Sequence, residues 1–184
     1  MQKSFKEIFF HGSDNPINKE DFEKILDVMY DNSYKNVIDF ITPPEGLTFN
    51  YVQKIYNKTT KNPIDEIRFH KLLNIFDTIT RHGYFVNSDN AVPTIINKLK
   101  NEPCKYTNYL VRRNEFLFAI VISIDINNVK IYGINYDLDN DEFIFALDGE
   151  TYRFETYDEL INFIINLNVK KSTYRCKKSD YKFI

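Results

Sequence analysis

Residues 118–136 read F-A-I-V-I-S-I-D-I-N-N-V-K-I-Y-G-I-N-Y, and this stretch decides the fold. Its first half, Phe118 to Ile126, is a continuous apolar run rich in β-branched residues, which favour strands. Asn127-Asn128 is a typical two-residue turn, and the apolar pattern resumes at once from Val129 to Tyr136. The sequence therefore predicts an antiparallel hairpin.

The turn position also predicts which side chains share a face of this hairpin. With Asn127 and Asn128 as the turn, Ile126 pairs with Val129, and the pairing then continues residue by residue. One face would carry Ile120, Ile122, Ile124, Ile126, Val129 and Ile131, and the other Val121, Ser123, Tyr132 and Ile134. Since both faces are apolar, we expect helices to cover both sides of the sheet.

Further elements are expected on both sides of the hairpin. The pattern predicts another strand at residues 105–113 and two short strands at 143–147 and 151–154, around Asp148-Gly149. Helical spacing of Val92, Ile95, Ile96 and Leu99 predicts a helix before the first strand. The capping box Thr156-Tyr157-Asp158-Glu159 opens a second helix after the last strand. The expected fold class is α+β, with a central antiparallel sheet flanked by two helices.

The first 80 residues have a different pattern, with apolar residues at helical spacing. Helices are predicted at residues 20–30, 34–41 and 49–56, and a fourth is predicted from Pro63 to Ile79. We therefore divide the chain into a helical extension, residues 1–80, and a sheet-containing domain, residues 81–184. The helical extension is a possible docking surface for a second protein partner.

Composition excludes several classes of protein. The chain has 184 residues and a net charge of -2, and no apolar run is long enough to span a membrane. Two distant cysteines, Cys104 and Cys176, suggest neither a disulfide framework nor a metal motif, so we expect a reducing, cytoplasmic location. The three histidines, His11, His70 and His82, are also dispersed. We expect no metal and no cofactor.

Arg112 is the residue that raises the question of function. Residues 109–115 read Y-L-V-R-R-N-E, so this arginine closes an apolar strand. A guanidinium in such a place costs free energy unless an anion meets it. One explanation is an ion pair with Glu102, Glu115 or a carboxylate on a helix. The other is the phosphate of a ligand.

Tyr109-Leu110-Val111-Arg112 resembles the F-L-V-R signature of the Src homology 2 family, which binds phosphotyrosine. The resemblance covers residues 82–169 and includes weaker matches in the family's order. These matches are His82-Gly83, the helix from Ala91, Val129-Lys130-Ile131-Tyr132, Phe143-Ile144 and the helix Y-D-E-L-I-N-F-I. It implies a Src homology 2-like sheet between two helices and a role in binding rather than catalysis.

The resemblance also implies the members of a phosphotyrosine site. Arg112 would grip the phosphate with its planar fork, and a short cradle of Arg113, Asn114 and Glu115 would follow it. Further members would come from the next two strands, namely Ser123, Ile131 and Tyr132. Two positions depart from the family, because Ile131 replaces its histidine and Gly133 replaces its lysine. The turn at Asp148-Gly149-Glu150 is short, so we expect low selectivity for the residues that flank the phosphotyrosine.

The resulting expectation is a phosphotyrosine-peptide-binding module that is not an enzyme. A thiol nucleophile at Cys104 with His82 as its base is disfavoured, because neither a glycine elbow nor an orienting third group accompanies them. The abundance of Ile, Asn and Lys is similar in style to divergent phosphotyrosine-binding domains of intracellular bacterial effectors, which would act in the host-cell cytosol. The alternative is a nucleic-acid or protein interaction domain that uses the basic, aromatic tail of residues 168–184.

Overall fold

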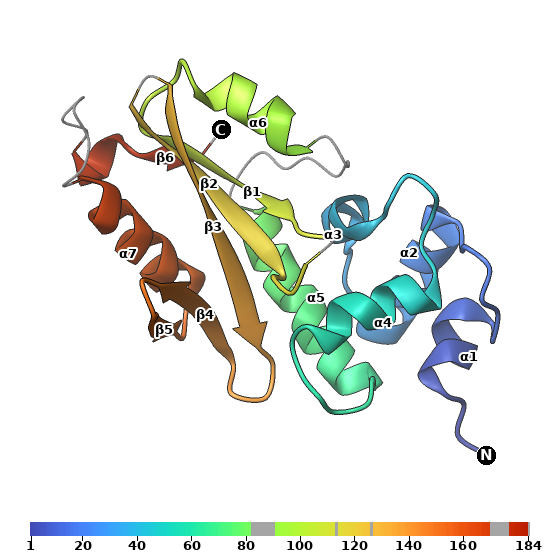
Figure 1. Cartoon of the computed structure of the whole chain (residues 1–184). Helices are drawn as coiled ribbons and strands as arrows, with labels where there is room; N and C mark the ends of the chain where they lie inside the picture. The colour runs from blue at the N-terminus through green and yellow to red at the C-terminus, as the bar shows by residue number, and fades with distance from the viewer. Residues whose placement is uncertain (82–90, 113, 126, 170–176, 184) are drawn as a thin grey trace.

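The computed structural model describes residues 1–81, 91–112, 114–125, 127–169 and 177–183 of the chain (Figure 1). The helices are α1 (Phe5–Phe10), α2 (Lys19–Tyr30), α3 (Lys35–Ile41), α4 (Phe49–Asn57), α5 (Glu66–Thr80), α6 (Ala91–Leu99) and α7 (Tyr157–Val169), with a short 3-10 helix, η1 (Lys178–Asp180). The strands are β1 (Lys105–Leu110), β2 (Phe118–Asp125), β3 (Asn128–Asp137), β4 (Glu142–Leu147), β5 (Glu150–Phe154) and β6 (Lys182–Phe183).

These strands form one sheet in the order β5-β4-β3-β2-β1-β6. Strands β1 to β5 are antiparallel, whereas the short β6 pairs with β1 in parallel. Helices α6 and α7 lie on opposite sides of the sheet (Figure 1). Ile95 and Leu99 of α6 pack against Val121, while α7 contributes its apolar residues to the larger core. The predicted α+β class, with a central antiparallel sheet between two helices, is confirmed.

The predicted boundaries hold for most elements because the local signals are strong. Thr156 and Glu159 form the expected capping box: the Glu159 N–H donates to Thr156 Oγ1 at 3.2 Å, and the Thr156 N–H donates to Glu159 Oε2 at 3.3 Å. Helix α5 starts later than predicted, because the cap is Asp65, whose carboxylate accepts from the Arg68 N–H at 2.8 Å. Helix α1 and strand β6 were not predicted.

The predicted faces of the β2–β3 hairpin are wrong. The register pairs Val121 with Ile131 and Ser123 with Val129, and it shifts at a bulge between Ser123 and Asp125. Because a one-residue slip turns every side chain to the other face, Val129 and Ile131 lie on the face of Val121. Ile120 and Ile122 instead share their face with Tyr132 and Ile134.

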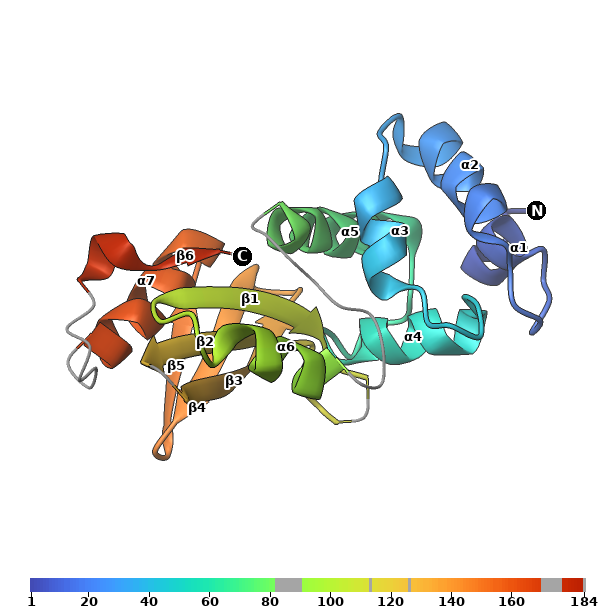
Figure 2. The same cartoon turned by 90° about the horizontal axis from the view of Figure 1, so that it is seen from above.

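The helical region and the sheet share one hydrophobic core. The largest cluster of buried residues runs without a break from Phe5 in α1 to Tyr181 after η1. It includes Phe9, Phe22 and Leu26 from the helices and Phe118 and Ile120 from β2, all fully buried. In both views α1 and α2 lie farthest from the sheet (Figures 1 and 2). The boundary near residue 80 therefore separates two architectures that are joined by a common core.

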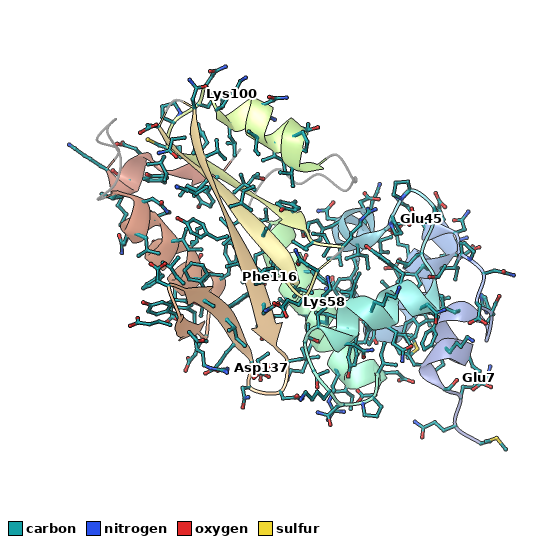
Figure 3. The ribbon with its side chains drawn as sticks, viewed as in Figure 1. Glu7, Glu45, Lys58, Lys100, Phe116 and Asp137 are labelled. Atoms are coloured by element: carbon teal, nitrogen blue, oxygen red, sulfur yellow. The ribbon has the colours of Figure 1, made fainter. Side chains whose placement is uncertain are left out.

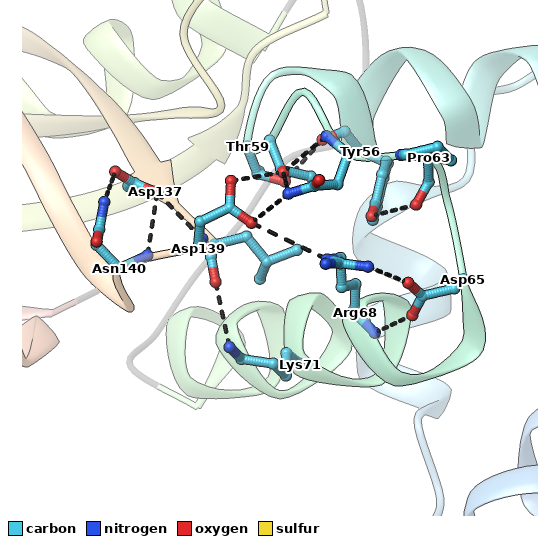
Figure 4. Close-up of polar contacts among 12 residues, drawn as sticks. Tyr56, Thr59, Pro63, Asp65, Arg68, Lys71, Asp137, Asp139 and Asn140 are labelled. Atoms are coloured by element: carbon cyan, nitrogen blue, oxygen red, sulfur yellow. Dashed lines mark hydrogen bonds and ion pairs between the residues drawn. The ribbon is translucent and has the colours of Figure 1, made fainter.

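Polar contacts also fasten the β3–β4 turn to the helical region (Figure 4). Asp139 accepts hydrogen bonds from Thr60 Oγ1 at 2.7 Å and from Asn62 Nδ2 at 2.9 Å. Lys71 of α5 donates to the Leu138 carbonyl at 3.1 Å and pairs with Asp141 at 2.8 Å. The turn and helix α5 are thus held in one arrangement by several independent bonds.

Two further findings bear on the sequence-based expectations. No helix in the described ranges is long and apolar enough to cross a membrane. Cys104, immediately before β1, is disulfide-bonded, which corrects the expectation that the cysteines are free. Disulfides persist mainly in oxidising compartments, so this bond does not support a reducing location.

Buried tyrosines should make the fold sensitive to alkaline pH. Burial raises the pKa of Tyr106 and of Tyr136 to about 12, and it raises that of Tyr157 well above its ordinary value. In the unfolded chain these hydroxyls ionise near pH 10, so the stability they contribute is complete below about pH 10 and is lost towards pH 12. Between pH 10 and 12, the free energy of unfolding measured with urea should fall as the pH rises. The fall should be smaller in Tyr136→Phe than in the wild type. A flat profile would contradict this prediction.

Candidate functional site

The site is built on the loop between β1 and β2. The Val111 N–H donates to the Leu117 carbonyl at 3.2 Å, and the Leu117 N–H donates to the Ile134 carbonyl of β3 at 3.0 Å. Within the loop, the Phe116 N–H donates to Asn114 Oδ1 at 3.0 Å, which is an Asx turn. Arg112, Asn114 and Glu115 therefore lie on a short loop between two segments that are bonded to the sheet.

Arg112 lies on this loop, two residues past the end of β1, and not on the strand as predicted. Its side chain is partly buried, and its Nη2 nitrogen is buried without a hydrogen-bond partner in the described part of the chain. The ion pairs between described residues do not include Arg112, so the proposed pairing with Glu102 or Glu115 is not found there. A buried guanidinium nitrogen with an unused donor costs free energy, which an acceptor would recover.

The expected cradle is placed only in part. Asn114 and Glu115 are exposed on the same loop as Arg112, and the Asn114 side-chain oxygen is used by the Phe116 N–H. The amide nitrogen of Asn114 remains the group that can donate to a ligand. Arg113 lies outside the described residues.

The other three predicted members lie away from Arg112. Ser123 is fully buried, with its Oγ 3.4 Å from the Asp125 carbonyl. It is six residues beyond Leu117 along β2, which is roughly 20 Å at about 3.3 Å per residue. Ile131 and Tyr132 lie on opposite faces of β3, as neighbours on a strand must. The Tyr132 hydroxyl donates to Asn168 Oδ1 of α7 at 3.0 Å, whereas Ile131 is 42% exposed. Of these three, only Ile131 is open to a ligand.

Phe116 covers the backbone at Gly133. A Cβ atom built on Gly133 would lie 2.6 Å from the Phe116 ring, closer than such atoms approach one another. The ring therefore occupies the place on β3 where the resemblance implies a contact with the phosphotyrosine. A ligand must reach Arg112 from the loop side instead of across Gly133.

A methyl group at Gly133 should displace the Phe116 ring and the loop with it. We expect Gly133→Ala to lower the free energy of unfolding by about 1–2 kcal/mol, the usual cost of overpacking. The same substitution in a Phe116→Ala background should cost much less, because the obstructing ring is gone. Urea unfolding of the four proteins measures this coupling, and equal costs in the two backgrounds would show that the ring is not the obstacle.

Lys58 is a member of the site that sequence reasoning missed. It is the C-cap of α4, and its Nζ donates to the carbonyls of Val111 at 2.7 Å and Phe116 at 3.0 Å. Figure 3 shows Lys58 beside Phe116 at the junction of the helical region and the sheet. Burial lowers the pKa of Lys58 to about 8, and no carboxylate among the described residues pairs with it. No signal in the sequence separates Lys58 from other lysines, because its partners lie more than fifty positions away.

A groove of about 410 Å³ opens beside Lys58, between the end of α4 and β3. Its lining includes the polar residues Asn57, Thr59, Thr60, Lys61 and Asn135. Asn135 also holds the loop, because its Oδ1 accepts from the Leu117 N–H at 3.2 Å. The groove thus borders the same loop that carries Arg112.

The alternative sites of the sequence analysis find little support among the described residues. Histidine, cysteine and carboxylate side chains form no cluster there that would hold a metal. His82, like Cys176, lies outside the described residues. In the tail, Tyr181 is buried and Lys182 belongs to β6, so these two do not form a free aromatic and basic surface. Residues 170–176 of the tail lie outside the described part.

The loop that carries Arg112 and Asn114, together with Lys58 of α4 that bonds to it, is thus the candidate anion site, and no carboxylate among the described residues pairs with either cation. Comparison with known proteins adds no relative to this picture. The chain matches no model of a known protein family, and no curated protein matches its sequence.

Proposed function

We propose that the protein is a non-enzymatic module that binds tyrosine-phosphorylated peptides through Arg112. The observation that carries this proposal is the buried Nη2 of that arginine, which has no hydrogen-bond partner in the described part of the chain and belongs to a loop bonded at both ends. A phosphate dianion offers three strong acceptor oxygens and the counter-charge that the site lacks. A phosphate, like a carboxylate, has a geometry that suits the guanidinium fork.

Two features favour phosphotyrosine over a shorter phosphoamino acid. Arg112 is partly buried, so a ligand must project its phosphate inward to meet Nη2. The aromatic ester holds its phosphate farther from the peptide backbone than phosphoserine does. The order of motifs that resembles the Src homology 2 family supports the same ligand.

We also propose low selectivity for the residues that flank the phosphotyrosine. The β4–β5 connection is a tight turn in which Asp148 and Gly149 have positive φ values of 52° and 82°. Such a turn is too short to build a wall around a ligand residue. A peptide array that reveals one strict flanking motif would contradict this part of the proposal.

The cellular setting follows from the ligand. Tyrosine phosphorylation belongs to cytosolic signalling, so we propose a cytosolic site of action, in the host cell if the chain is a bacterial effector. The Cys104 disulfide would be reduced there. Cys104 lies just before β1 and Arg112 lies just after it, so the whole length of that strand separates the two residues. Binding should therefore be the same with and without a reductant.

A fluorescence polarisation titration tests the function. The probes are a phosphotyrosine peptide, its unphosphorylated form, the matching phosphoserine peptide and a short single-stranded oligonucleotide, each with and without reductant. Binding only to the phosphotyrosine peptide supports the proposal. Preferential binding of the oligonucleotide, weakening steeply with salt, would instead favour the nucleic-acid alternative. Equal binding of both phosphopeptides would reduce the proposal to a general phosphate site.

A further inference from the structure

The N-terminal helical region reaches the candidate phosphate loop through the side chain of Lys58. Lys58 leaves the end of α4 and donates to the carbonyl of Val111, the residue before Arg112, and to that of Phe116, the residue after the loop. The two bonds therefore span residues 112–115 from end to end. Opening the loop would break at least one of them.

Lys58 is partly buried without a carboxylate partner among the described residues, which is unusual for an ammonium group. An ammonium that is half withdrawn from water normally pairs with a carboxylate, because two neutral carbonyls do not repay its lost hydration. The acidic residues that line the adjacent groove are engaged elsewhere: Asp137 pairs with Arg153 at 3.5 Å, and Asp139 bonds to Thr60 and Asn62. Lys58, which bonds to the loop, and Arg112, which lies on it, thus have no counter-ion among the described residues.

We propose that Lys58 is a positioning residue of the phosphate site, which bonds to the carbonyls of Val111 and Phe116 and so clamps the loop that carries Arg112 and Asn114. This inference rests on the proposed function. The inference gives the helical region a role in ligand binding, because Lys58 comes from α4 and not from the sheet. The helical region is then a part of the binding module, in addition to any role as a docking surface.

The clamp should weaken as Lys58 loses its proton. Burial lowers the pKa of Lys58 to about 8, so the ammonium is present at pH 7 and mostly neutral at pH 9.5. The titratable groups that line the groove with Lys58 are Lys61, Tyr136, Asp137 and Asp139, while Arg112 and Glu115 lie on the loop between the two carbonyls that Lys58 bonds. The phosphate is already a dianion above pH 7, so its own charge does not change in this range. Affinity for a phosphotyrosine peptide should therefore fall several-fold from pH 7 to pH 9.5.

The decisive experiment compares the full-length protein with Lys58→Met, Lys58→Arg and the matched control Lys61→Met. We expect Lys58→Met to bind the phosphotyrosine peptide about tenfold more weakly at pH 7, in line with the loss of one charged group. Its affinity should no longer change between pH 7 and pH 9.5. Lys58→Arg should keep most of the affinity without the fall at high pH, and Lys61→Met should behave like the wild type.

Several outcomes would overturn the clamp while leaving the proposed function intact. One is wild-type affinity in Lys58→Met, and another is a wild-type affinity that stays flat from pH 7 to pH 9.5. The second needs no variant, so it remains decisive if Lys58→Met fails to fold.

If the wild type binds no phosphopeptide, the proposed function fails. Hydrogen exchange then tests the clamp independently of ligand binding. The Phe116 and Leu117 amides should exchange about tenfold faster in Lys58→Met than in Lys61→Met if the loop is clamped. Equal exchange in the two variants would overturn the inference.

Discussion

Arg112→Lys is expected to lower the affinity for a phosphotyrosine peptide by about two orders of magnitude, although the charge is retained. Lysine has a single ammonium on a flexible stem and cannot offer two parallel N–H groups to two phosphate oxygens. The buried Nη2 position would then hold no donor for the ligand. Polarisation titration of the wild type and the variant at the same salt concentration measures the difference.

The matched control is Arg153→Lys. Arg153 lies on β5, with its side chain 49% exposed and paired with Glu142 at 3.0 Å. Exposed ion pairs contribute little to stability, so this variant should bind and unfold like the wild type. Unchanged affinity in Arg112→Lys would show that this arginine does not recognise the phosphate. Equal losses in both variants would indicate a general effect of replacing an arginine, and not recognition of the phosphate by Arg112.

Asn108→Leu is expected to lower the free energy of unfolding by about 2–3 kcal/mol. Asn108 is buried in β1, and its side-chain amide lies 2.9 and 3.0 Å from the hydroxyl of Tyr157 at the start of α7. Its Nδ2 also reaches the Ile79 carbonyl of α5 at 3.4 Å. Leucine of similar size would remove both hydrogen bonds between Asn108 and the buried Tyr157 hydroxyl, and urea unfolding would measure the cost.

A second substitution tests the cause of that loss. In the double variant Asn108→Leu with Tyr157→Phe both polar groups are gone, so most of the stability should return. The exposed Asn166→Leu on α7 is the matched control and should change stability by less than about 0.5 kcal/mol. If the double variant is as unstable as the sum of the single ones, the hydrogen bond is not the origin of the effect.

Elements with strong local signals could be predicted from the sequence. The capping box at Thr156, the turn at Asp148-Gly149 and the apolar spacing of α2 and α5 each depend on neighbours within one or two turns of chain. Such short-range chemistry is the same wherever the element lies in the fold. These local signals were sufficient to predict the α+β class and the helices of the first 80 residues.

The register of the β2–β3 hairpin could not be predicted in the same way. Both faces of this hairpin are apolar, so the alternation of side chains does not distinguish one register from its neighbour. The bulge between Ser123 and Asp125 decides the question, and its effect on the pairing is visible only when both strands are in place. Ser123 is fully buried near the far end of β2.

By itself, the sequence determined that Arg112 lies near the end of an apolar strand, because the run of apolar residues around it is local information; the structure ends that strand at Leu110, two residues earlier. Only the tertiary structure decided what surrounds it: Phe116 covers Gly133, and Lys58 comes from α4 to hold the loop. Contacts between residues far apart in the chain depend on how the core packs as a whole, and no local pattern encodes them. The chemistry of the candidate site therefore became visible only when the helical region and the sheet were seen to share one core.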